Sequence, residues 1–224
     1  MIFCFGNSHA AIFVGGPPCG KLVGRVHKNT VQVNPTHTWI ASVFMGPIIA
    51  YNFVEHHLPK VREVLETPET RADKDRDVVM LYVGEVDCRY HLAKRIMESG
   101  GPAEPVVEEC ADRFFEAATL LRAEGWKVAL VGTHPTTLEP HSEDPDKPHW
   151  GDWSFRNRIC VLWNEALRKR CETAGVPFVC VYDRLVGADN RTRTDYYVDY
   201  CHLSYEKCFP MFEEELKRVG LSAS

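Results

Sequence analysis

The sequence lacks any apolar run that approaches the roughly 20 residues needed to cross a bilayer. Its start also lacks the basic and apolar regions of a signal peptide, and Met1–Gly6 instead has the character of a first strand. We therefore expect no membrane span and no leader. A cytoplasmic location is the default expectation.

Positive charge is scarce as well. The 224 residues include 26 Lys and Arg against 31 Asp and Glu, which gives a formal net charge of −5. A protein that follows nucleic-acid phosphates needs a basic face, and an electrostatic membrane anchor needs a basic cluster. The charge balance argues against both, so no nucleic-acid partner is expected.

The cysteines lack the spacing of a metal or redox motif. There are nine, an odd number, and none forms a CxxC pair. Disulfide frameworks are typical of shorter, loop-rich secreted chains, whereas most of these cysteines lie in apolar or periodic stretches. We expect them to be small buried hydrophobic side chains.

Short apolar runs are present, and they predict strands. With 45% apolar residues, the chain has enough material for a sizeable core. Four runs have the composition of strands that are buried on both faces: Ile2–Phe5, Val78–Val83, Val128–Val131 and Phe178–Val181. A fifth strand is expected at Leu22–His27 or Thr30–Val33.

Helical patterns separate these runs. Apolar residues at three- and four-residue spacing predict helices from Val107 to Leu121, from Phe155 to Ala166 and from Phe212 to Val219, with Pro210 just before the last. Alternating strands and helices favour an α/β fold, a three-layer sandwich around a central parallel five-stranded, flavodoxin-like sheet. We expect one domain over residues 1–224, with the functional site at the carboxyl ends of the strands.

Two segments at opposite ends of the chain carry candidate catalytic residues. Ser8 follows the first strand in Gly6-Asn7-Ser8, where its hydroxyl could act as a nucleophile beside backbone N–H groups or could cap a helix. Asp199 precedes His202 by three residues, a spacing that lets the acid orient the imidazole. Alone, the pair could equally be a cap before a surface histidine.

Together these motifs resemble those of the SGNH, or GDSL-type, hydrolase superfamily. Its first block corresponds to Gly6-Asn7-Ser8, its second-block glycine to Gly46, its third block to Gly84–Asp87 and its last block to Asp199–His202. The blocks occur in the family's order over nearly the whole chain. The resemblance implies Ser8 as nucleophile, His202 as base, Asp199 as its orienting acid, and the N–H groups of Ser8 and Gly46 as oxyanion donors.

The resemblance has two departures. Asn7 replaces the usual Asp and can still make the local turn hydrogen bonds. Val86 replaces the Asn that donates to the oxyanion, and losing one such donor can cost about 10²–10³ in rate. Gly84–Arg89 reads G-E-V-D-C-R and resembles a variant third block, in which Arg89 is the candidate substitute donor. An ion pair of Arg89 with Glu85 or Asp87 is the competing interpretation.

Other residues near the strand ends have open roles. His9 is expected to be structural or to contact substrate, and not to be the base. His91 and His134 could line the cleft or could be ordinary surface histidines, and Cys88 could be a nucleophile. The stretch Pro135–Trp153 is expected to be a long surface loop, a lid whose aromatic residues either bind ligand or pack on the core.

Two further patterns are set aside. Gly15–Lys21 matches half of a phosphate-binding loop, but Pro17 and Pro18 lack N–H donors, and Leu22 stands where Ser or Thr would bind Mg²⁺. The histidines at 56, 57, 141 and 149 lack the spacing of a zinc motif. No metal and no organic cofactor is expected.

The resemblance implies a serine esterase that cleaves small acyl esters, such as O-acetyl groups on a carbohydrate or short-chain esters. Two alternatives remain open. A domain that has lost hydrolysis could bind a glycan or a partner protein, and an O-acyltransferase could use the same triad. The sequence does not predict an oligomeric state.

Overall fold

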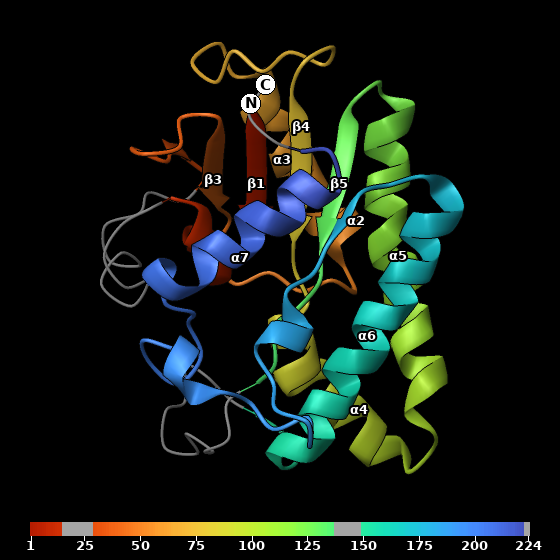
Figure 1. Cartoon of the computed structure of the whole chain (residues 1–224). Helices are drawn as coiled ribbons and strands as arrows, with labels where there is room; N and C mark the ends of the chain where they lie inside the picture. The colour runs from red at the N-terminus through yellow and green to blue at the C-terminus, as the bar shows by residue number, and fades with distance from the viewer. Residues whose placement is uncertain (15–28, 137–148, 222–224) are drawn as a thin grey trace.

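A six-stranded sheet forms the centre of the molecule. The structure is a computed structural model, and it describes residues 1–14, 29–136 and 149–221. Its strand order is β2-β3-β1-β4-β5-β6 (Figure 1). Five strands run parallel, and β2 pairs antiparallel with β3 at one edge. The strands are β1 (Ile2–Gly6), β2 (Val31–Val33), β3 (Ile40–Phe44), β4 (Val78–Tyr82), β5 (Lys127–Val131) and β6 (Phe178–Val179).

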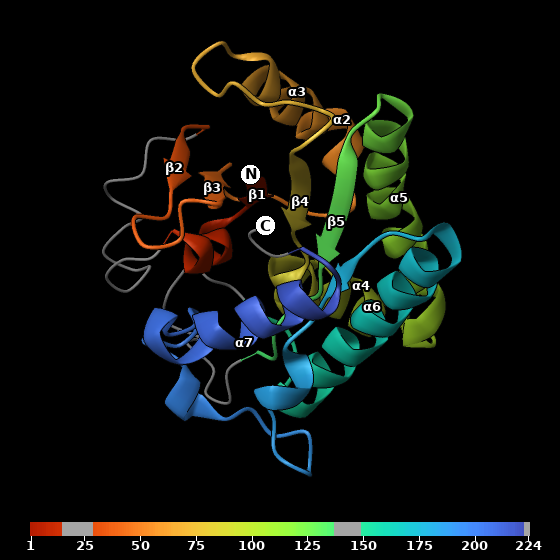
Figure 2. The same cartoon turned by 45° about the horizontal axis from the view of Figure 1, so that its top comes forward.

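Helices cover both faces of this sheet (Figure 2). One face carries α2 (Phe53–His56), α3 (Leu58–Glu66), α4 (Leu92–Ser99), α5 (Ala103–Ala123) and α6 (Trp153–Ala174). The other carries the 3₁₀ helix η1 (Ser8–Phe13) and α7 (Tyr205–Arg218). Strand β4 shows the division, because Leu81 faces the first layer while Met80 and Tyr82 face the second.

The predicted α/β sandwich is confirmed, with one strand more than expected. The four buried runs are β1, β4, β5 and β6, and Thr30–Val33 contains β2. The sequence analysis missed β3, a short parallel strand with the polar Ser42 at its middle. The alternative fifth strand, Leu22–His27, lies outside the described residues.

The last helix differs from its prediction. Pro210 lies inside α7, which begins at Tyr205. Cys208 and Phe209, ahead of the proline, are buried on the same side as Phe212 and Leu216, and this burial favours continuing the helix through Pro210. Within the described ranges, no helix is both long and apolar enough to cross a membrane.

The register of the sheet aligns the loops that follow its strands. Gly6 is level with Phe44 of β3 and with Tyr82 of β4, and Tyr82 is level with Val131 of β5. Two residues beyond these aligned positions come Ser8, Gly46, Gly84 and Thr133. The parallel arrangement therefore gathers the three sequence blocks that follow strands at one edge of the sheet.

Candidate active site

Ser8 opens the turn that follows β1. The side chain of Asn7 caps η1 by accepting a hydrogen bond from the backbone N–H of His9 at 3.0 Å. This is the local role expected of Asn7, and it leaves the Ser8 hydroxyl free of capping. Gly6 is required here, because a Cβ atom would lie 2.6 Å from the carbonyl oxygen of Tyr82.

The Ser8 hydroxyl meets an imidazole from the far end of the chain. Ser8 Oγ lies 2.8 Å from His202 Nε2, and His202 Nδ1 lies 2.8 Å from Asp199 Oδ2. A carboxylate can only accept, so Nδ1 carries the proton and Nε2 accepts from the Ser8 hydroxyl. The three side chains thus form a hydrogen-bonded series in the order that serine nucleophile chemistry uses.

A tight turn holds Asp199 beside His202. The Val198 N–H donates to the His202 carbonyl at 2.9 Å, and Asp199 Oδ1 accepts the backbone N–H groups of Cys201 and His202 at 2.8 Å each. Burial raises the pKa of Asp199, but the hydrogen bonds from the His202 side chain and from these N–H groups outweigh it and hold the pKa well below its usual value. Asp199 is therefore ionised at neutral pH.

Contacts with α6 and with the loop after β5 anchor this C-terminal segment. Asn157 of α6 donates to the carbonyl of Asn190 at 2.9 Å and to the hydroxyl of Thr192 at 3.0 Å. The Tyr197 hydroxyl donates to the Pro135 carbonyl at 2.5 Å. These bonds fix the position from which His202 reaches Ser8.

A second histidine and carboxylate lie next to the first pair. His9 is buried, and its Nε2 lies 3.0 Å from Glu85 Oε2. Glu85 also accepts the Nε–H of Arg89 at 2.6 Å. Burial raises the pKa of Glu85, yet Arg89 and His9 hold it well below its usual value, whereas burial lowers the pKa of His9. Glu85 is thus a buried anion beside a neutral His9, and the structural or substrate-contacting role expected of that histidine stays a prediction.

The position of Arg89 gives the competing interpretation a firm basis. Arg89 lies on the π-helical turn η2 (Asp87–His91) and forms an ion pair with Glu85, four residues earlier. Its part in substrate binding stays a prediction.

His134 is buried rather than exposed, so a surface position is excluded. Its Nδ1 lies 2.8 Å from the Tyr82 hydroxyl and its Nε2 lies 3.3 Å from the Cys201 carbonyl. Burial lowers the pKa of His134 to about 3. The ring is therefore neutral, donates from Nε2 and accepts from Tyr82. It joins β4 to the segment that carries His202.

Asp87 of the third sequence block binds the loop that contains Gly46. Both of its carboxylate oxygens lie 3.0 Å from the backbone nitrogen of Ala50, which donates to them and holds that loop in place. Burial raises its pKa to about 7. Gly46 itself has a φ of 84° and follows Met45, whose N–H donates to the Gly6 carbonyl at 2.9 Å. The Gly46 loop is thus tied to the Ser8 turn on one side and to Asp87 on the other.

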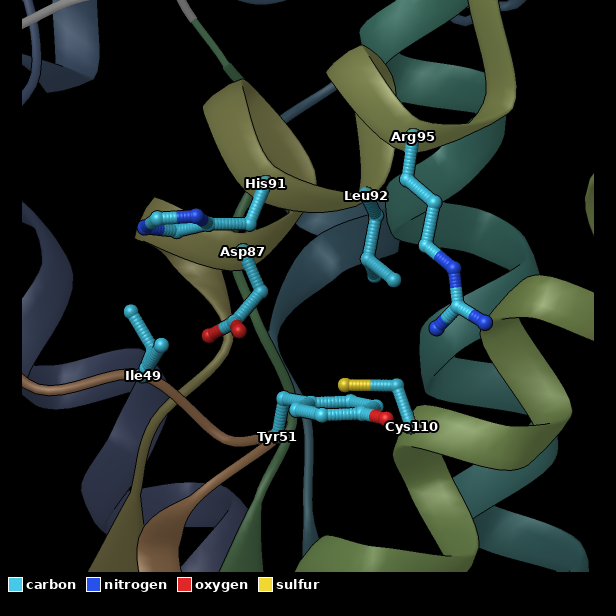
Figure 3. A pocket seen from close by; sticks show the side chains of 7 residues that line it. All are labelled: Ile49, Tyr51, Asp87, His91, Leu92, Arg95 and Cys110. Carbon is cyan, nitrogen blue, oxygen red and sulfur yellow. The ribbon is translucent and has the colours of Figure 1, made fainter. Parts of the chain in front are cut away.

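Asp87 also lines a pocket of about 330 Å³ together with Ile49, Tyr51, His91, Leu92, Arg95 and Cys110 (Figure 3). Its contacts are therefore with a loop backbone and this pocket. The oxyanion or substrate-binding role that the SGNH resemblance implies for Asp87 stays a prediction. Within the described part of the chain, its carboxylate oxygens accept from the Ala50 N–H, whereas Ser8 and His202 are bonded to each other.

Gly84 fills a position that excludes any side chain. Its φ is +129°, and a Cβ atom would lie 2.5 Å from Nε1 of Trp163 on α6. The next residues, Glu85 and Val86, lead into η2, and Val86 is its N-cap. Cys88 lies in the core with its pKa raised well above the usual value by burial, which disfavours it as a nucleophile.

The predicted lid is described only at its ends, because residues 137–148 lie outside the described ranges. Trp150 and Phe155 pack against the core, which supports the packing interpretation for these two rings. Trp153 lies under the guanidinium of Arg191, at 5.8 Å. The phosphate-loop pattern at Gly15–Lys21 and His141 also lie outside the described residues.

Solved structures provide the comparison. A GDSL-like lipase from Bacteroides thetaiotaomicron matches with a TM-score of 0.57 and 16% identity, over 97% of this chain and 85% of that chain. The chain has the fold of the SGNH hydrolases. An acetyl xylan esterase matches with a TM-score of 0.54 and 14% identity, over 97% and 98% of the two chains. No protein-family model and no curated protein sequence matches this chain.

A third SGNH-fold neighbour is a catalytic mutant of an acetylxylan esterase from Geobacillus stearothermophilus. It has a TM-score of 0.50 and 13% identity, and the match covers 100% of this chain and 96% of that chain. Similarity at this level of identity establishes the fold alone. The G-E-V-D-C-R variant of the third block stays a prediction.

Three residues of the site were not singled out in the sequence. Glu85 was considered only as a partner of Arg89, and Tyr82 and Cys201 were not assigned to the site. Tyr82 and Glu85 flank the end of β4, where strand-end reasoning would have included them. Cys201 lies inside the Asp199–His202 motif, and only the fold of that turn brings its sulfur to the His202 ring.

Proposed function

We propose that this protein is an SGNH-type serine hydrolase that cleaves small carboxylic esters. The observation that carries the proposal is the pair of 2.8 Å hydrogen bonds that link Ser8 Oγ to His202 Nε2 and His202 Nδ1 to Asp199 Oδ2. The esterase and lipase neighbours with the same fold support the same reaction class.

The reaction begins with Ser8. Its Oγ attacks the ester carbonyl carbon while His202 Nε2 takes the hydroxyl proton. Asp199 keeps the imidazole in the required tautomer and stabilises the imidazolium that forms. The imidazolium then gives its proton to the departing alcohol, which leaves an acyl-enzyme. A water molecule, activated by His202, releases the acid and regenerates Ser8.

The developing oxyanion needs preorganised donors. We assign the backbone N–H groups of Ser8 and Gly46 to this task, because their loops are tied together by the bond from Met45 to Gly6. Val86 cannot donate where the family has Asn. Restoring a donor with Val86→Asn would therefore be expected to raise, not lower, turnover.

For the substrate, we propose an O-acetyl group on a carbohydrate or another short acyl ester, in line with the acetylxylan esterases among the structural neighbours. The chain, as a single domain over residues 1–224, would carry the activity. A non-catalytic binding domain and an acyl transferase are outcomes that the test separates.

The test is turnover of an aryl acetate and of acetylated xylo-oligosaccharides by the parent chain and by Ser8→Ala. We expect Ser8→Ala to lose at least about 10³-fold in kcat, and a fluorophosphonate to label the parent at Ser8 only. Equal turnover by the two proteins would reject the proposal. A folded parent without an adduct would favour the binding domain, and product that moves to an added sugar acceptor would favour the transferase.

A further inference from the structure

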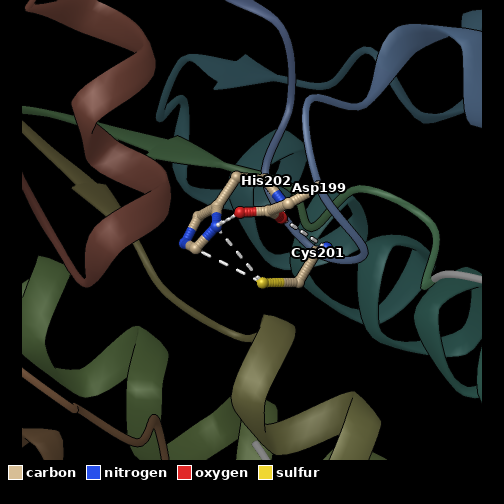
Figure 4. Close-up of side chains that lie close together, drawn as sticks. All are labelled: Asp199, Cys201 and His202. Atoms are coloured by element: carbon tan, nitrogen blue, oxygen red, sulfur yellow. Dashed lines mark hydrogen bonds and ion pairs between the residues drawn. The ribbon is translucent and has the colours of Figure 1, made fainter. Parts of the chain in front are cut away.

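Three different metal-ligand side chains converge on the turn that carries Asp199 and His202. Cys201 Sγ lies 3.3 Å from His202 Nδ1, and the same Nδ1 lies 2.8 Å from Asp199 Oδ2. One ligand atom from each of these residues lies within 4.8 Å of the other two. Figure 4 shows the sulfur facing the imidazole from the same turn as the carboxylate. The proposed ester chemistry uses no thiol.

We propose that Asp199, Cys201 and His202 form a binding site for Zn²⁺, a thiophilic divalent cation, and that occupation of this site switches the Ser8 centre off. The binding of the cation stands on the geometry alone, whereas its inhibitory effect rests on the proposed function.

The ligand spacing suits a tetrahedral ion. Zinc binds sulfur at about 2.3 Å and nitrogen or oxygen at about 2.0–2.2 Å, so its ligand atoms lie about 3.3–3.6 Å apart. The sulfur-to-nitrogen separation already has this size, and the nitrogen-to-oxygen separation needs to open by a few tenths of an ångström. A fourth position remains for water.

The turn is preorganised before any metal arrives. Asp199 Oδ1 holds the backbone N–H groups of Cys201 and His202, which leaves Oδ2 for the metal. Cys201 and His202 are buried, while 28% of the Asp199 side chain is exposed and gives the cation a path from solvent. The positive charge of nearby Arg89 is compensated by Glu85.

Metal binding would release one proton to solvent, from the Cys201 thiol. The proton of His202 moves from Nδ1 to Nε2, so that the neutral ring binds the ion through Nδ1, and the ion replaces the hydrogen bond between Nδ1 and Asp199 Oδ2. Because Nε2 then carries a proton, it cannot accept the proton of the Ser8 hydroxyl, and the first step of ester cleavage is blocked.

The test has a direct readout that needs no substrate. The full chain is titrated with Co²⁺, whose bond to a thiolate gives a charge-transfer absorption, and Zn²⁺ is then added to displace it. Variants are Cys201→Ala, Ser8→Ala and, as a matched thiol control, Cys180→Ala, which removes a half-buried cysteine beside β6. Mg²⁺, which prefers oxygen ligands, serves as the cation control.

We expect the absorption in the parent, in Ser8→Ala and in Cys180→Ala, and its loss in Cys201→Ala. Zinc should inhibit ester turnover of the parent, relative to each protein's own metal-free rate, and Cys201→Ala should weaken this inhibition by more than about tenfold. Magnesium should do neither.

Absence of the absorption in the parent, or its persistence in Cys201→Ala, would overturn the site. Unchanged zinc sensitivity in Cys201→Ala would overturn it as well. Because cobalt binding is read without substrate, the absorption tests the site even if Ser8→Ala shows that the proposed hydrolysis is wrong.

Discussion

Two histidine–carboxylate pairs lie side by side at the carboxyl edge of the sheet. In one, His202 Nδ1 is 2.8 Å from Asp199, and in the other, His9 Nε2 is 3.0 Å from Glu85. The two ring centroids are 5.1 Å apart. The residue types are nearly the same. The two pairs differ in the surroundings of the second ring nitrogen, the one that does not contact the acid, which is Nε2 in His202 and Nδ1 in His9.

His202 presents that nitrogen to the Ser8 hydroxyl, whereas Nδ1 of His9 is buried with no partner among the described residues. The acids differ as well, since 28% of the Asp199 side chain is exposed against 3% for Glu85, which also binds Arg89. The two acids therefore orient rings whose other nitrogens have different surroundings. Under the proposed function, the group on the far side of the ring determines which of the two histidines acts as the base.

The largest difference is expected when each histidine is replaced by glutamine. His202→Gln removes the proposed proton acceptor and should lower kcat by about 10⁴-fold or more. His9→Gln keeps an N–H toward Glu85 and should retain most of the turnover. Steady-state kinetics on both variants measure this, with circular dichroism as a check of folding. Equal losses would mean that both rings take part in the reaction.

Neutralising the two acids should separate activity from stability. Asp199→Asn disturbs the His202 tautomer and should lower kcat by about 10⁴-fold, with a smaller loss of unfolding free energy than Glu85→Gln because the Asn oxygen can still accept the Cys201 and His202 N–H groups. Glu85→Gln leaves Arg89 without its buried partner and should lower the free energy of unfolding by about 3–5 kcal/mol. Urea denaturation measures the free energy of unfolding of both variants, and steady-state kinetics measure their kcat. A stable Glu85→Gln protein would show that this ion pair is not what holds η2.

A third carboxylate at the same edge of the sheet, Asp87, differs from the other two in how it makes the stability of the fold depend on pH. The pKa of Asp87 is raised to about 7 in the folded chain, from 3.8, whereas those of Asp199 and Glu85 are lowered. An acid with a raised pKa makes the fold less stable as pH rises from its unfolded pKa to its folded one. Asp199 and Glu85 instead lose their stabilising contribution as pH falls through their lowered values.

We therefore expect the free energy of unfolding of the parent to carry a decrease on the order of a few kcal/mol from Asp87 between about pH 4 and 7. Asp87→Asn should abolish this decrease. The Asn side-chain oxygen can still accept the Ala50 N–H. The measurement is the midpoint of urea unfolding at several pH values in parent and variant. Parallel pH curves for the two proteins would contradict the raised pKa.

The parts of the fold that follow from local pattern were predictable. The runs that became β1, β4, β5 and β6 are apolar throughout, because such strands are covered on both faces. Strand β3 escaped detection since Ser42 interrupts a run of only five residues. Pro210 suggested a helix start from its missing N–H, but the apolar face of α7 extends past it.

The pairing of Ser8 with Asp199 and His202 could be proposed from motif order, since each block lies after a strand or near the chain end. The contacts of the other polar groups depend on tertiary packing. Nothing local indicates that Asp87 accepts the Ala50 N–H 37 positions earlier, or that His134 accepts from Tyr82 52 positions away. Reading charge and spacing alone could not decide between Glu85 and Asp87 as the partner of Arg89.

The contact between Ser8 and His202 spans 194 positions. Any fragment that ends before His202 therefore contains the hydroxyl without the imidazole. If these residues perform the proposed chemistry, such a fragment has no ester turnover. Ester turnover would then report that the segment carrying His202 has packed against α6.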